Sequence, residues 1–408
     1  MKKTLLALLI CSTYANASGL LLQEAVVANA GTTGAGDGVY TETATASWTN
    51  PATMTHMGEQ KTTVNMMVLD LQMDYTDIDT NSGAEGARYT GDGDAETVMP
   101  SIGIFHVMQV SEDIHLGVNF GAVGGSSVDY GTNWDAGNHL DTAVMKAVQL
   151  NPTMSYKIDH NWSVGIGAQI NYGIIEVSTA GFDTEAGTDW AFGYNAGAMY
   201  KAEKWAVGLS YRSKIEFEFD DINADVIAPN LGSGPANPSI LPLPSSFTVG
   251  TELLAPAIID LSGSYDVNGQ LTLLSSVQFH QWSDFSGTPV YNDTLESYDV
   301  DLEIDRDWDD VWKFAVGADY QLNAEWALKA GFSYETSPQD DPAKQWVDLP
   351  VGEQYRYSIG ATTYWDDTRI DMFYEYADLG SVDIDRSKAN VSGTFDGKIH
   401  FIGVNVTF

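Results

Sequence analysis

The chain ends in Ile399-His-Phe-Ile-Gly-Val-Asn-Val-Thr-Phe408, a stretch in which apolar and small or polar residues alternate. Successive side chains of a strand point to opposite faces, so Ile402, Val404, Val406 and Phe408 share one face and the residues between them share the other. The pattern predicts a β-strand that is apolar on one side only. A soluble β-sandwich also contains such strands, so this stretch by itself leaves the fold class open.

The same alternation recurs through most of the chain in runs of about ten residues bounded by turn residues. In residues 326–334 the apolar side chains oppose a face that carries Lys329, and in residues 314–320 they oppose a face that contains Asp319. We predict strands at about 60–75, 97–108, 114–124, 143–157, 162–178, 188–200, 205–219, 256–267, 271–283, 308–320, 326–336, 353–364, 369–378 and 396–408. Residues 245–253 would make the number odd, and we therefore predict a loop there.

The two ends of these strands differ in the lengths of the connections between strands. Tight turns follow the even-numbered strands, as at residues 159–161, 201–204, 268–269 and 322–325, whereas longer polar loops follow the odd-numbered ones. Three tight turns are followed by Trp162, Trp205 and Trp326, and Trp365 lies in a fourth; an indole suits the depth at which hydrocarbon meets headgroups. The expected fold is all-β, a 14-stranded antiparallel transmembrane β-barrel with both chain ends on the short-turn side.

Composition supports this class of protein. The chain has 408 residues and a formal charge of −37, which excludes nucleic acid as a partner because binding it requires neutralisation of phosphates. Its 44% of hydrophobic and 11% of aromatic residues are too many for a disordered acidic chain. The mean hydropathy of −0.15 shows that the apolar residues are too diluted for helical membrane spans, whereas alternation in a barrel dilutes them in this way.

Residues 1–17 are predicted to be a secretory signal peptide. Lys2 and Lys3 precede an apolar core, and Ala15-Asn16-Ala17 is a small-residue cleavage site. The apolar run is shorter than the roughly 18 residues that a membrane anchor needs. The only cysteine, Cys11, lies inside this segment and follows Ile10, which disfavours lipidation. A mature chain without thiols is consistent with export and excludes disulfides and thiolate metal sites.

Residues 18–57 form a separate segment before the barrel of residues 58–408. The segment is rich in glycine and small residues and ends in Asn50-Pro51-Ala52, where the proline disfavours a barrel strand. Its apolar residues 20–22 and 26–27 argue against a loose tail. We therefore predict a hatch, a plug that lies in the lumen of the barrel.

At this point the sequence resembles the FadL-type outer-membrane transporters of long-chain fatty acids and other hydrophobic compounds. The resemblance rests on Ser18-Gly19 with Gln23, the glycine-rich residues 31–38, residues 47–52, residues 312–320 and 326–334, Ser337-Pro338 and Leu349-Pro350. It implies a 14-stranded barrel with an N-terminal hatch in the bacterial outer membrane. It also implies passive transport without catalysis or cofactor: ligand enters an extracellular apolar groove, reaches a lumenal pocket, and leaves after hatch movement or sideways at a strand kink.

Several residues are candidates for these steps. Residues 220–255 supply an apolar groove among prolines, or alternatively pack the loop against the rim; the candidates are Ile227, Leu231, Ile240, Leu241, Leu243 and Phe247. Lys313 and Lys329 are expected to face the lumen, where they bind a ligand carboxylate or pair with carboxylates such as Asp319 or Glu335. Gly121 and Gly124 are candidates for a kink in the third strand, because glycine favours bulges.

Other classes of function are less well supported. A general diffusion porin is the main alternative, but the six arginines are not gathered on one strand. An outer-membrane hydrolase would need a nucleophile, and no serine lies in a G-x-S-x-G turn. Residues 77–88 resemble a calcium loop but lack its glycine and final glutamate, so no metal site is assigned.

The expected partners are hydrophobic small molecules, outer-membrane lipid and lipopolysaccharide. Phe408 resembles the terminal signal that the barrel-assembly machinery reads in outer-membrane proteins. The acidic residues 299–310 are either a solvated loop or a site for Ca²⁺ or Mg²⁺ that bridges to lipopolysaccharide phosphates. A monomer is expected.

Overall fold

The computed structural model describes residues 26–79, 91–131, 134–137, 139–179, 182–226, 245–292, 302–386 and 391–408. The predicted signal peptide (residues 1–17), the first eight hatch residues (18–25), and Ile227, Leu231, Ile240, Leu241 and Leu243 lie outside the described residues. The 3₁₀ helices (η), α-helix and strands are η2 (Asp37–Val39), α1 (Ala46–Thr49), η3 (Pro51–His56), β1 (Gln60–Asp79), β2 (Gly93–Gln109), β3 (Ile114–Asp129), β4 (Thr142–Lys157), β5 (Trp162–Ser178), β6 (Phe182–Thr184), β7 (Gly187–Lys201), β8 (Trp205–Arg212), β9 (Ile215–Val226), β10 (Ser246–Ala255), β11 (Ile258–Asp266), β12 (Leu271–His280), η4 (Trp282–Asp284), β13 (Gly287–Asn292), β14 (Leu302–Asp305), β15 (Val311–Gln321), β16 (Ala327–Glu335), β17 (Gln354–Trp365), β18 (Thr368–Arg386) and β19 (Val391–Thr407).

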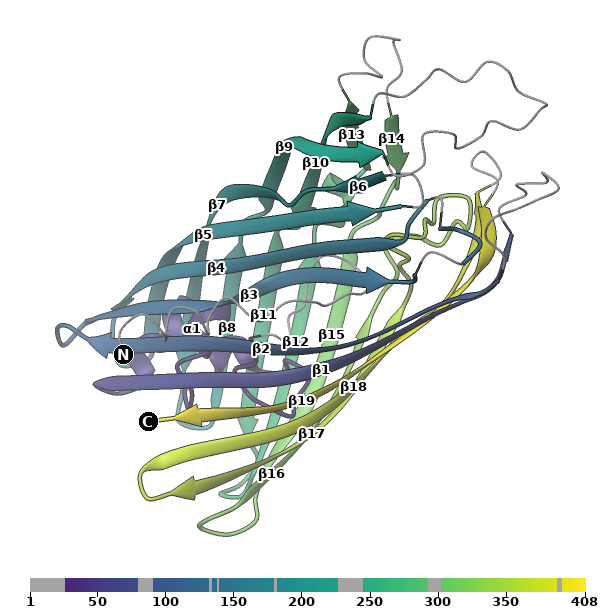
Figure 1. Ribbon diagram of the computed structural model, residues 1–408. Helices are drawn as coiled ribbons and strands as arrows, with labels where there is room; N and C mark the ends of the chain where they lie inside the picture. Colours follow the sequence, from purple (N-terminus) through teal and green to yellow (C-terminus); the bar gives the residue numbers. More distant parts are fainter. Residues whose placement is uncertain are drawn as a thin grey trace, which may run out of the picture.

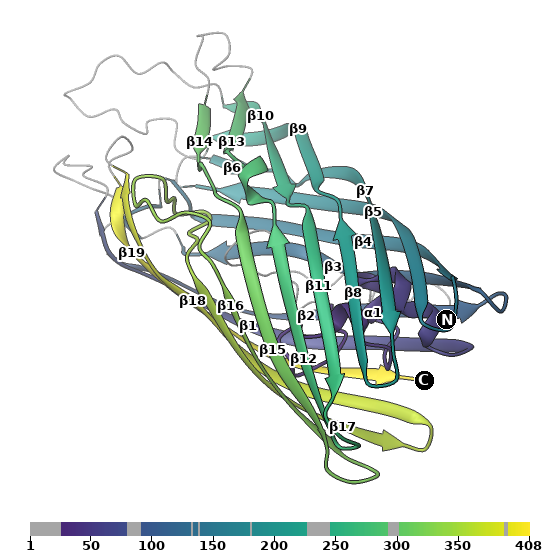
Figure 2. The same cartoon turned by 180° about the vertical axis from the view of Figure 1, so that it is seen from behind.

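The strands form a single antiparallel sheet that closes on itself (Figures 1 and 2). The closing pair is β1 with β19, which stay in register from Thr63 opposite Thr407 to Thr76 opposite Thr394. Five barrel strands are each divided into two segments, namely β6 with β7, β8 with β9, β10 with β11, β12 with β13, and β14 with β15. The nineteen segments therefore make fourteen barrel strands, which confirms the predicted fold and strand number.

The prediction of a loop at residues 245–253 is wrong, because this stretch is β10 and pairs with β9. β10 and β11 are the two halves of one barrel strand that is interrupted at Pro256, which has no N–H to donate to a ladder. The neighbouring strands break at the same level: Arg212, which ends β8, pairs with Ile258, and Ile258 pairs with His280, which ends β12. Since the extra segment continues an existing strand, the total stays even.

The two ends of the barrel differ as expected. Six turns of two to five residues join consecutive strands at the end that carries the C-terminus, and most of the longer connections lie at the opposite end (Figure 1). Some strands run further than their sequence pattern indicates: β18 and β19 extend until Arg386 pairs with Val391, so their connection is short as well. The four tryptophans of the short-turn end are exposed, as the predicted girdle requires; they are Trp162, Trp205, Trp326 and Trp365.

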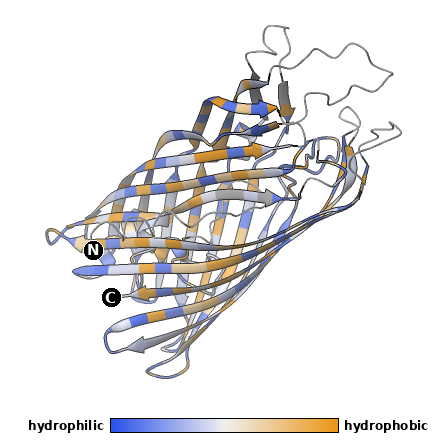
Figure 3. Ribbon diagram, in the orientation of Figure 1, coloured by the Kyte–Doolittle hydropathy of each residue, from blue (hydrophilic) through white to orange (hydrophobic). Residues whose placement is uncertain are grey.

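Near the short-turn end the barrel has its apolar residues outside and its polar residues inside, whereas toward the longer loops the lumen also buries apolar side chains such as Leu71 and Phe395. In β16, Leu328 and Phe332 are 46% and 37% exposed, whereas Lys329 and Ser333, the residues that follow them, are 4% and 2% exposed. Colouring by hydropathy shows the alternation along the strands (Figure 3). An apolar outer surface with a polar interior is the arrangement of a barrel that faces lipid. Within the described residues, no helix is long and apolar enough to cross a membrane.

Residues 26–57 fill the lumen near the short-turn end, where α1 is seen inside the barrel (Figures 1 and 2). All but four of these residues are buried, the exceptions being Gly34, Glu42, Thr49 and His56. The N-terminal segment therefore forms a hatch, as predicted.

The Asn50-Pro51-Ala52 motif locks the end of the hatch. The Asn50 side-chain oxygen caps η3 by accepting a hydrogen bond from the Ala52 N–H at 3.0 Å, and Pro51 occupies the first helical position, where no N–H is needed. The Asn50 amide nitrogen donates to the carbonyls of Gly38 (2.8 Å) and Ala198 (3.2 Å). Ser163 of β5 donates to the Ala52 carbonyl at 2.8 Å. The motif thus joins two parts of the hatch to two barrel strands.

Glycines of the barrel wall make room for the hatch backbone. A Cβ at Gly331 would lie 2.3 Å from the Thr32 carbonyl carbon, and one at Gly360 would lie 2.7 Å from the Ala30 carbonyl oxygen. On the other side of the lumen, a Cβ at Gly165 would lie 2.6 Å from the Pro51 carbonyl carbon. These contacts are with backbone atoms, which cannot rotate away as a long side chain can. Glycine is therefore required at these positions for the hatch to sit where it does.

The first prediction concerns Gly331. We expect Gly331→Ala to leave the barrel assembled, because its outward face is unchanged, but to displace the hatch near Thr32. Single-channel conductance of the purified protein in planar bilayers should then rise several-fold, while heat-modifiable migration on gels stays as in the unaltered protein. Gly263→Ala is the matched control, because its Cβ would have no neighbour closer than 3.4 Å. Equal conductance of the two variants would show that Gly331 does not seat the hatch.

Candidate functional site

Two adjoining cavities lie between the hatch and the barrel wall. The first holds about 700 Å³ and the second about 630 Å³ of space not filled by atoms, open solvent included. Both are bordered by Val26 and Trp48 of the hatch and by Arg212 and Ile258 of the wall. Together they form one inner cavity whose two halves differ in polarity.

The polar half of the inner cavity contains two lumenal cations. Lys313 of β15 is only 2% exposed and borders the cavity with Asp37, Asp260 and Gln278. Arg212, the last residue of β8, donates to Gln149 Oε1 at 3.1 Å and to the Trp48 carbonyl at 2.7 Å, and its guanidinium lies 4.9 Å from the centre of a Trp48 ring. Among the described residues, no carboxylate oxygen lies within 4.0 Å of the Arg212 nitrogens. Asp37, Asp260 and Glu375 border the same half, so its charges are mixed, and Arg212 is the cation that can meet an anionic group.

The apolar half of the inner cavity lies at the level where the barrel strands break. Its wall is formed mainly by aliphatic and aromatic side chains from β3, β4, β9 and the break itself: Val123, Met145, Ala147, Ile215, Phe217 and Pro256. A chain of methylene groups or an aromatic ring would gain free energy here by leaving water.

An outer pocket adjoins the inner cavity on the side of the longer loops. It holds about 1280 Å³, open solvent included, and shares Met145 with the apolar half of the inner cavity. Its lining is largely apolar, from β4, β5, β6, β9, β10 and residues 346–349: Val144, Ile175, Val177, Phe182, Ile222, Val249, Leu253, Trp346 and Leu349. His139 also borders it and meets the Trp346 ring at 5.1 Å, and burial lowers the pKa of this histidine, so its ring is neutral at neutral pH. The pocket suits an apolar ligand.

Residues 346–349, which we call the roof of the outer pocket, are held by a buried arginine and by a tyrosine of β1. Arg306, only 1% exposed, donates to both carboxylate oxygens of Asp348 at 3.1 and 2.6 Å and lies 5.5 Å from the Phe285 and Trp308 rings. Tyr75 of β1 donates to the Val347 carbonyl at 2.8 Å. Charge-assisted bidentate pairs are among the stronger hydrogen bonds, so the roof is fixed from two sides of the barrel.

The wall beside the inner cavity has a place where strand pairing is lost. β2 and β3 pair only from Ile104 opposite Phe120 to Gln109 opposite His115, although β2 pairs with β1 up to Gly93 and β3 pairs with β4 up to Asp129. The β3–β4 register shifts by a bulge between Ala122 and Gly124. The bulged residues, with Val123 between them, border the apolar half of the inner cavity.

The kink candidates lie at this irregularity. Gly124 ends the bulge, and Gly121 precedes it, where a Cβ would meet Val26 of the hatch at 3.2 Å and Phe105 at 3.6 Å. The irregular part of β3 is thus in contact with both the hatch and the inner cavity. Of the groove candidates, Phe247 is described; it lies in β10 and its ring meets Phe182, a residue of the outer pocket, at 5.6 Å.

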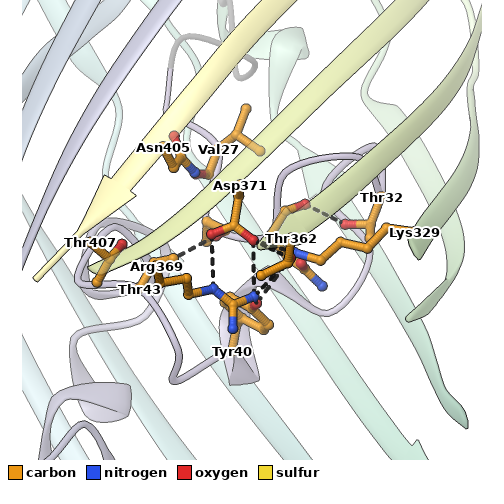
Figure 4. Close-up of polar contacts among 12 residues, drawn as sticks. Val27, Thr32, Tyr40, Thr43, Lys329, Thr362, Arg369, Asp371, Asn405 and Thr407 are labelled. Carbon is orange, nitrogen blue, oxygen red and sulfur yellow. Dashed lines mark hydrogen bonds and ion pairs between the residues drawn. The ribbon is translucent and has the colours of Figure 1, made fainter. Parts of the chain in front are cut away.

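Lys329 lies apart from these cavities, in a charged cluster that contacts Tyr40 of the hatch (Figure 4). Its ammonium pairs with Asp371 of β18 at 2.8 Å, and both side chains are almost completely buried. Arg369 donates to the same carboxylate through Nε and Nη2, each at 2.9 Å, and Thr362 donates at 2.5 Å. The carboxylate partner of Lys329 is thus Asp371. It is neither Asp319 nor Glu335, the two examples that the sequence pattern suggests.

Sequence reasoning missed Arg212, which the structure places at the junction of the two halves of the cavity. The alternation of residues 205–212 could have identified it, because Ala206, Gly208, Ser210 and Arg212 share one face of the strand. The arginine therefore falls on the face with small residues, which is the lumen-facing side. Asp371 was missed in the same way. The rule that placed Lys313 and Lys329 in the lumen applies to both residues.

Comparison with known proteins gives consistent matches over the whole chain. Residues 8–408 match the family model described as outer membrane protein transport protein (OMPP1/FadL/TodX). A long-chain fatty acid transport protein of Escherichia coli is 23% identical, covering 98% of this chain and 96% of that protein. Outer membrane protein P1 of Haemophilus influenzae is also 23% identical, covering 91% of this chain and 88% of that protein.

Solved structures show the same fold. The crystal structure of a Pseudomonas aeruginosa FadL homologue matches with a TM-score of 0.81 at 18% identity, over 98% of this chain and 99% of that one. The Pseudomonas putida toluene transporter TodX matches with a TM-score of 0.66 at 13% identity, over 96% and 98% of the two chains.

The second prediction concerns Lys329. Removing one partner of a buried ion pair usually costs about 3–5 kcal/mol. Because Arg369 still pairs with Asp371, we expect Lys329→Met to lower the free energy of unfolding by about 2 kcal/mol, below that usual cost. Guanidinium unfolding in detergent, followed by tryptophan fluorescence, would measure the change against Lys204→Met, an exposed turn lysine. A loss of affinity for a fatty acid without a loss of stability would instead assign Lys329 to the ligand.

Proposed function

The chain belongs to the OMPP1/FadL/TodX family of outer-membrane transport proteins, and from this premise we propose that it takes up long-chain fatty acids or other hydrophobic compounds as a passive channel. The family assignment makes it an integral outer-membrane β-barrel. The observation that supports the proposal is the succession of an apolar outer pocket and an inner cavity that adjoin at Met145. We propose that no catalytic step and no cofactor are involved.

The first step is capture at the outer pocket. The apolar side chains of this pocket would remove a hydrophobic molecule from water, which is favourable in proportion to the apolar area buried. Phe247 and Phe182 extend the apolar surface beside it. The groove candidates Ile227, Leu231, Ile240, Leu241 and Leu243 belong to the connection that follows β9, and we propose that they serve the same step.

The second step is binding in the inner cavity. An alkyl chain or aromatic ring would occupy the apolar half, next to Phe217 and Met145. A carboxylate would lie between Arg212 and Lys313, of which Arg212 borders both halves. A charged group in a largely dehydrated cavity needs an opposite charge close by, and these two side chains supply it.

The third step is release, for which the irregular strand β3 offers a route. The inner cavity is bordered by Ala122, Val123 and Gly124, at the place where β2 and β3 no longer pair. A hydrophobic ligand that passed here would enter the membrane without crossing water. We propose this lateral route, with Gly121 and Gly124 permitting the bulge, in preference to release into the periplasm.

A general diffusion porin is the weaker reading. A porin needs an open lumen, whereas residues 26–57 occupy the lumen here and are nearly all buried. Barrel glycines that fit the hatch backbone indicate that this position of the hatch is part of the folded structure.

We propose three further partners on the basis of the barrel surface. Outer-membrane lipid and lipopolysaccharide would contact the exposed apolar band. Phe408, which is exposed at the end of β19, would be read by the barrel-assembly machinery during insertion. We propose that the protein acts as a monomer.

The third prediction tests the inner cavity. Hydrogen bonds to charged groups contribute about 1.5–3 kcal/mol, so Arg212→Gln or Lys313→Gln should weaken the binding of palmitate about 10- to 100-fold. Binding of the uncharged analogue hexadecanol should change less than threefold. Isothermal titration of the purified protein in detergent would measure both affinities. If the two variants bind palmitate as the unaltered protein does, the carboxylate lies elsewhere.

The fourth prediction tests the proposal against a porin. We expect deletion of residues 18–52 to open the lumen and so to raise single-channel conductance at least tenfold, and to alter radiolabelled fatty acid uptake by cells. A porin would already show large, steady conductance with the hatch present, and loss of its gene would leave fatty acid uptake unaffected.

A further inference from the structure

The second half of the hatch, residues 40–57, is held by cations of the barrel wall. Arg369 donates to the Tyr40 hydroxyl at 2.6 Å, and Lys329 lies 3.5 Å from the same oxygen (Figure 4). Lys61 and Lys201 donate to Thr41, at 2.7 Å to its carbonyl and 3.1 Å to its hydroxyl. Arg212 donates to the Trp48 carbonyl at 2.7 Å. Five cations from different strands thus converge on residues 40–48.

Further hydrogen bonds secure residues 44–52 of this half. The Ala44 N–H donates to Thr63 of β1 at 2.9 Å, and Ser47 donates to Asn119 of β3 at 2.8 Å. The Asn50-Pro51-Ala52 motif adds its contacts with β5 and β7. Residues 40–57 are therefore fixed to β1, β3, β5, β7 and β18.

The barrel wall holds the first half of the hatch through neutral groups. Within the hatch, the Ala28 and Asn29 N–H groups donate to the Asp37 carboxylate, and Thr43 donates to the Ala28 carbonyl. Asn405 donates to the Val27 carbonyl at 2.9 Å, and the Gly36 and Gly38 N–H groups donate to the hydroxyls of Ser276 (3.0 Å) and Ser262 (3.1 Å). Hydrogen bonds between neutral groups contribute less than those to charged groups. This half is therefore the more weakly attached.

The first half is also strained. Thr33 has a φ of 55°, a left-handed conformation that is a true outlier for a β-branched residue, whereas Gly31, Gly34 and Gly36 adopt φ of 95°, 85° and 76° without this cost. Asn29 is fully buried, yet neither atom of its side-chain amide has a hydrogen-bond partner within the described part of the chain. The second half also contains such groups, the hydroxyls of Thr45 and Thr55, so the backbone of Thr33 is what distinguishes the first half. Strain and unsatisfied polar groups of this kind persist only where the surroundings impose them, and they concentrate in segments that move or bind.

The strained half forms the floor of the inner cavity. Val26, Val27, Thr33, Gly34 and Asp37 all border its polar side. Movement of residues 26–36 would open this floor and free the contact between Val26 and the β3 bulge at Gly121, whereas movement of residues 41–57 would break the cationic contacts.

We propose that Tyr40 is the positioning residue at which the hatch divides into a fixed arm, residues 41–57, and a moving arm, residues 26–36. The Arg369–Asp371–Lys329 cluster holds Tyr40 against the wall, so the moving arm swings without unseating the rest of the hatch. This inference rests on the proposed function, because it assigns the hatch movement of that function to particular residues.

The fifth prediction compares two tyrosines that accept a hydrogen bond from the same arginine. Tyr40→Phe removes the hatch-side hydroxyl, and Tyr364→Phe removes the 3.1 Å bond between Arg369 and a residue of β17 that lies outside the hatch. For Tyr40→Phe we expect hydrogen exchange of residues 41–49 to increase at least tenfold in detergent, with palmitate affinity within twofold of the unaltered protein. Tyr364→Phe should leave exchange in the hatch unchanged. Equal exchange in the two variants would overturn the role of Tyr40.

A disulfide tests which arm moves. The only cysteine of the chain is Cys11, within the predicted signal peptide, so introduced thiols have no competitor in the processed protein. A Cβ at Gly317 would lie 3.2 Å from the Ala35 Cβ, a few tenths of an ångström short of disulfide geometry. We expect the oxidised Ala35→Cys/Gly317→Cys variant to lose at least 90% of radiolabelled palmitate uptake and to recover it on reduction. The single variants Ala35→Cys and Gly317→Cys should be insensitive to oxidation.

The outcomes separate this inference from the proposed function. Full uptake by the oxidised double variant would show that residues 26–36 need not move and would overturn the division. If palmitate raised hydrogen exchange equally in residues 26–36 and 43–57, the hatch would move as one body. This result would also overturn the division. If the unaltered protein neither binds nor takes up palmitate, hexadecanol or toluene, the proposed function itself fails.

Discussion

A wall that stands in hydrocarbon must pair all of its backbone N–H and C=O groups within the protein, and the rest of this structure depends on that constraint. A sheet meets it only by closing, which here is done by β1 and β19. Closure explains why the number of strands stays even when β10 is added, because the new segment continues the strand of β11 beyond Pro256 instead of forming another. It also places apolar side chains such as Leu328 and Phe332 on the outer surface, whereas polar side chains such as Lys329, Ser333 and Asn405 are buried.

A closed barrel of this size has a polar lumen that something must fill. The hatch does so with backbone as much as with side chains, and glycines at positions such as Gly165, Gly331 and Gly360 let two backbones approach each other. One group of charges that the lumen buries is paired: Lys329 and Arg369 share Asp371. Because a buried charge without a partner is very costly, such a cluster fixes its own geometry and can therefore fix the hatch through Tyr40.

The pairing constraint is relaxed beside the inner cavity. β2 and β3 stop pairing beside the inner cavity, and the bulge in β3 lies at the same place. The strand breaks near Pro256 coincide with the apolar half of the cavity, so the irregular backbone of the wall borders the space in which we place the ligand. The regular part of the barrel then acts as a rigid frame around a hatch with one strained and one well-anchored arm.

The sequence by itself determined the fold class, the number of barrel strands, the hatch and the membrane-facing side of the three strands with the clearest alternation, because a period of two residues in hydrophobicity is a local property that survives without knowledge of neighbours. The same rule placed Lys313 and Lys329 in the lumen. Only the tertiary structure decided what these residues meet: Asp371 lies 42 residues from Lys329 in sequence, and Arg212 meets Trp48 across the lumen. The register between strands and the path of the hatch set these distances. Both result from closure of the whole sheet, which no single stretch of the sequence specifies.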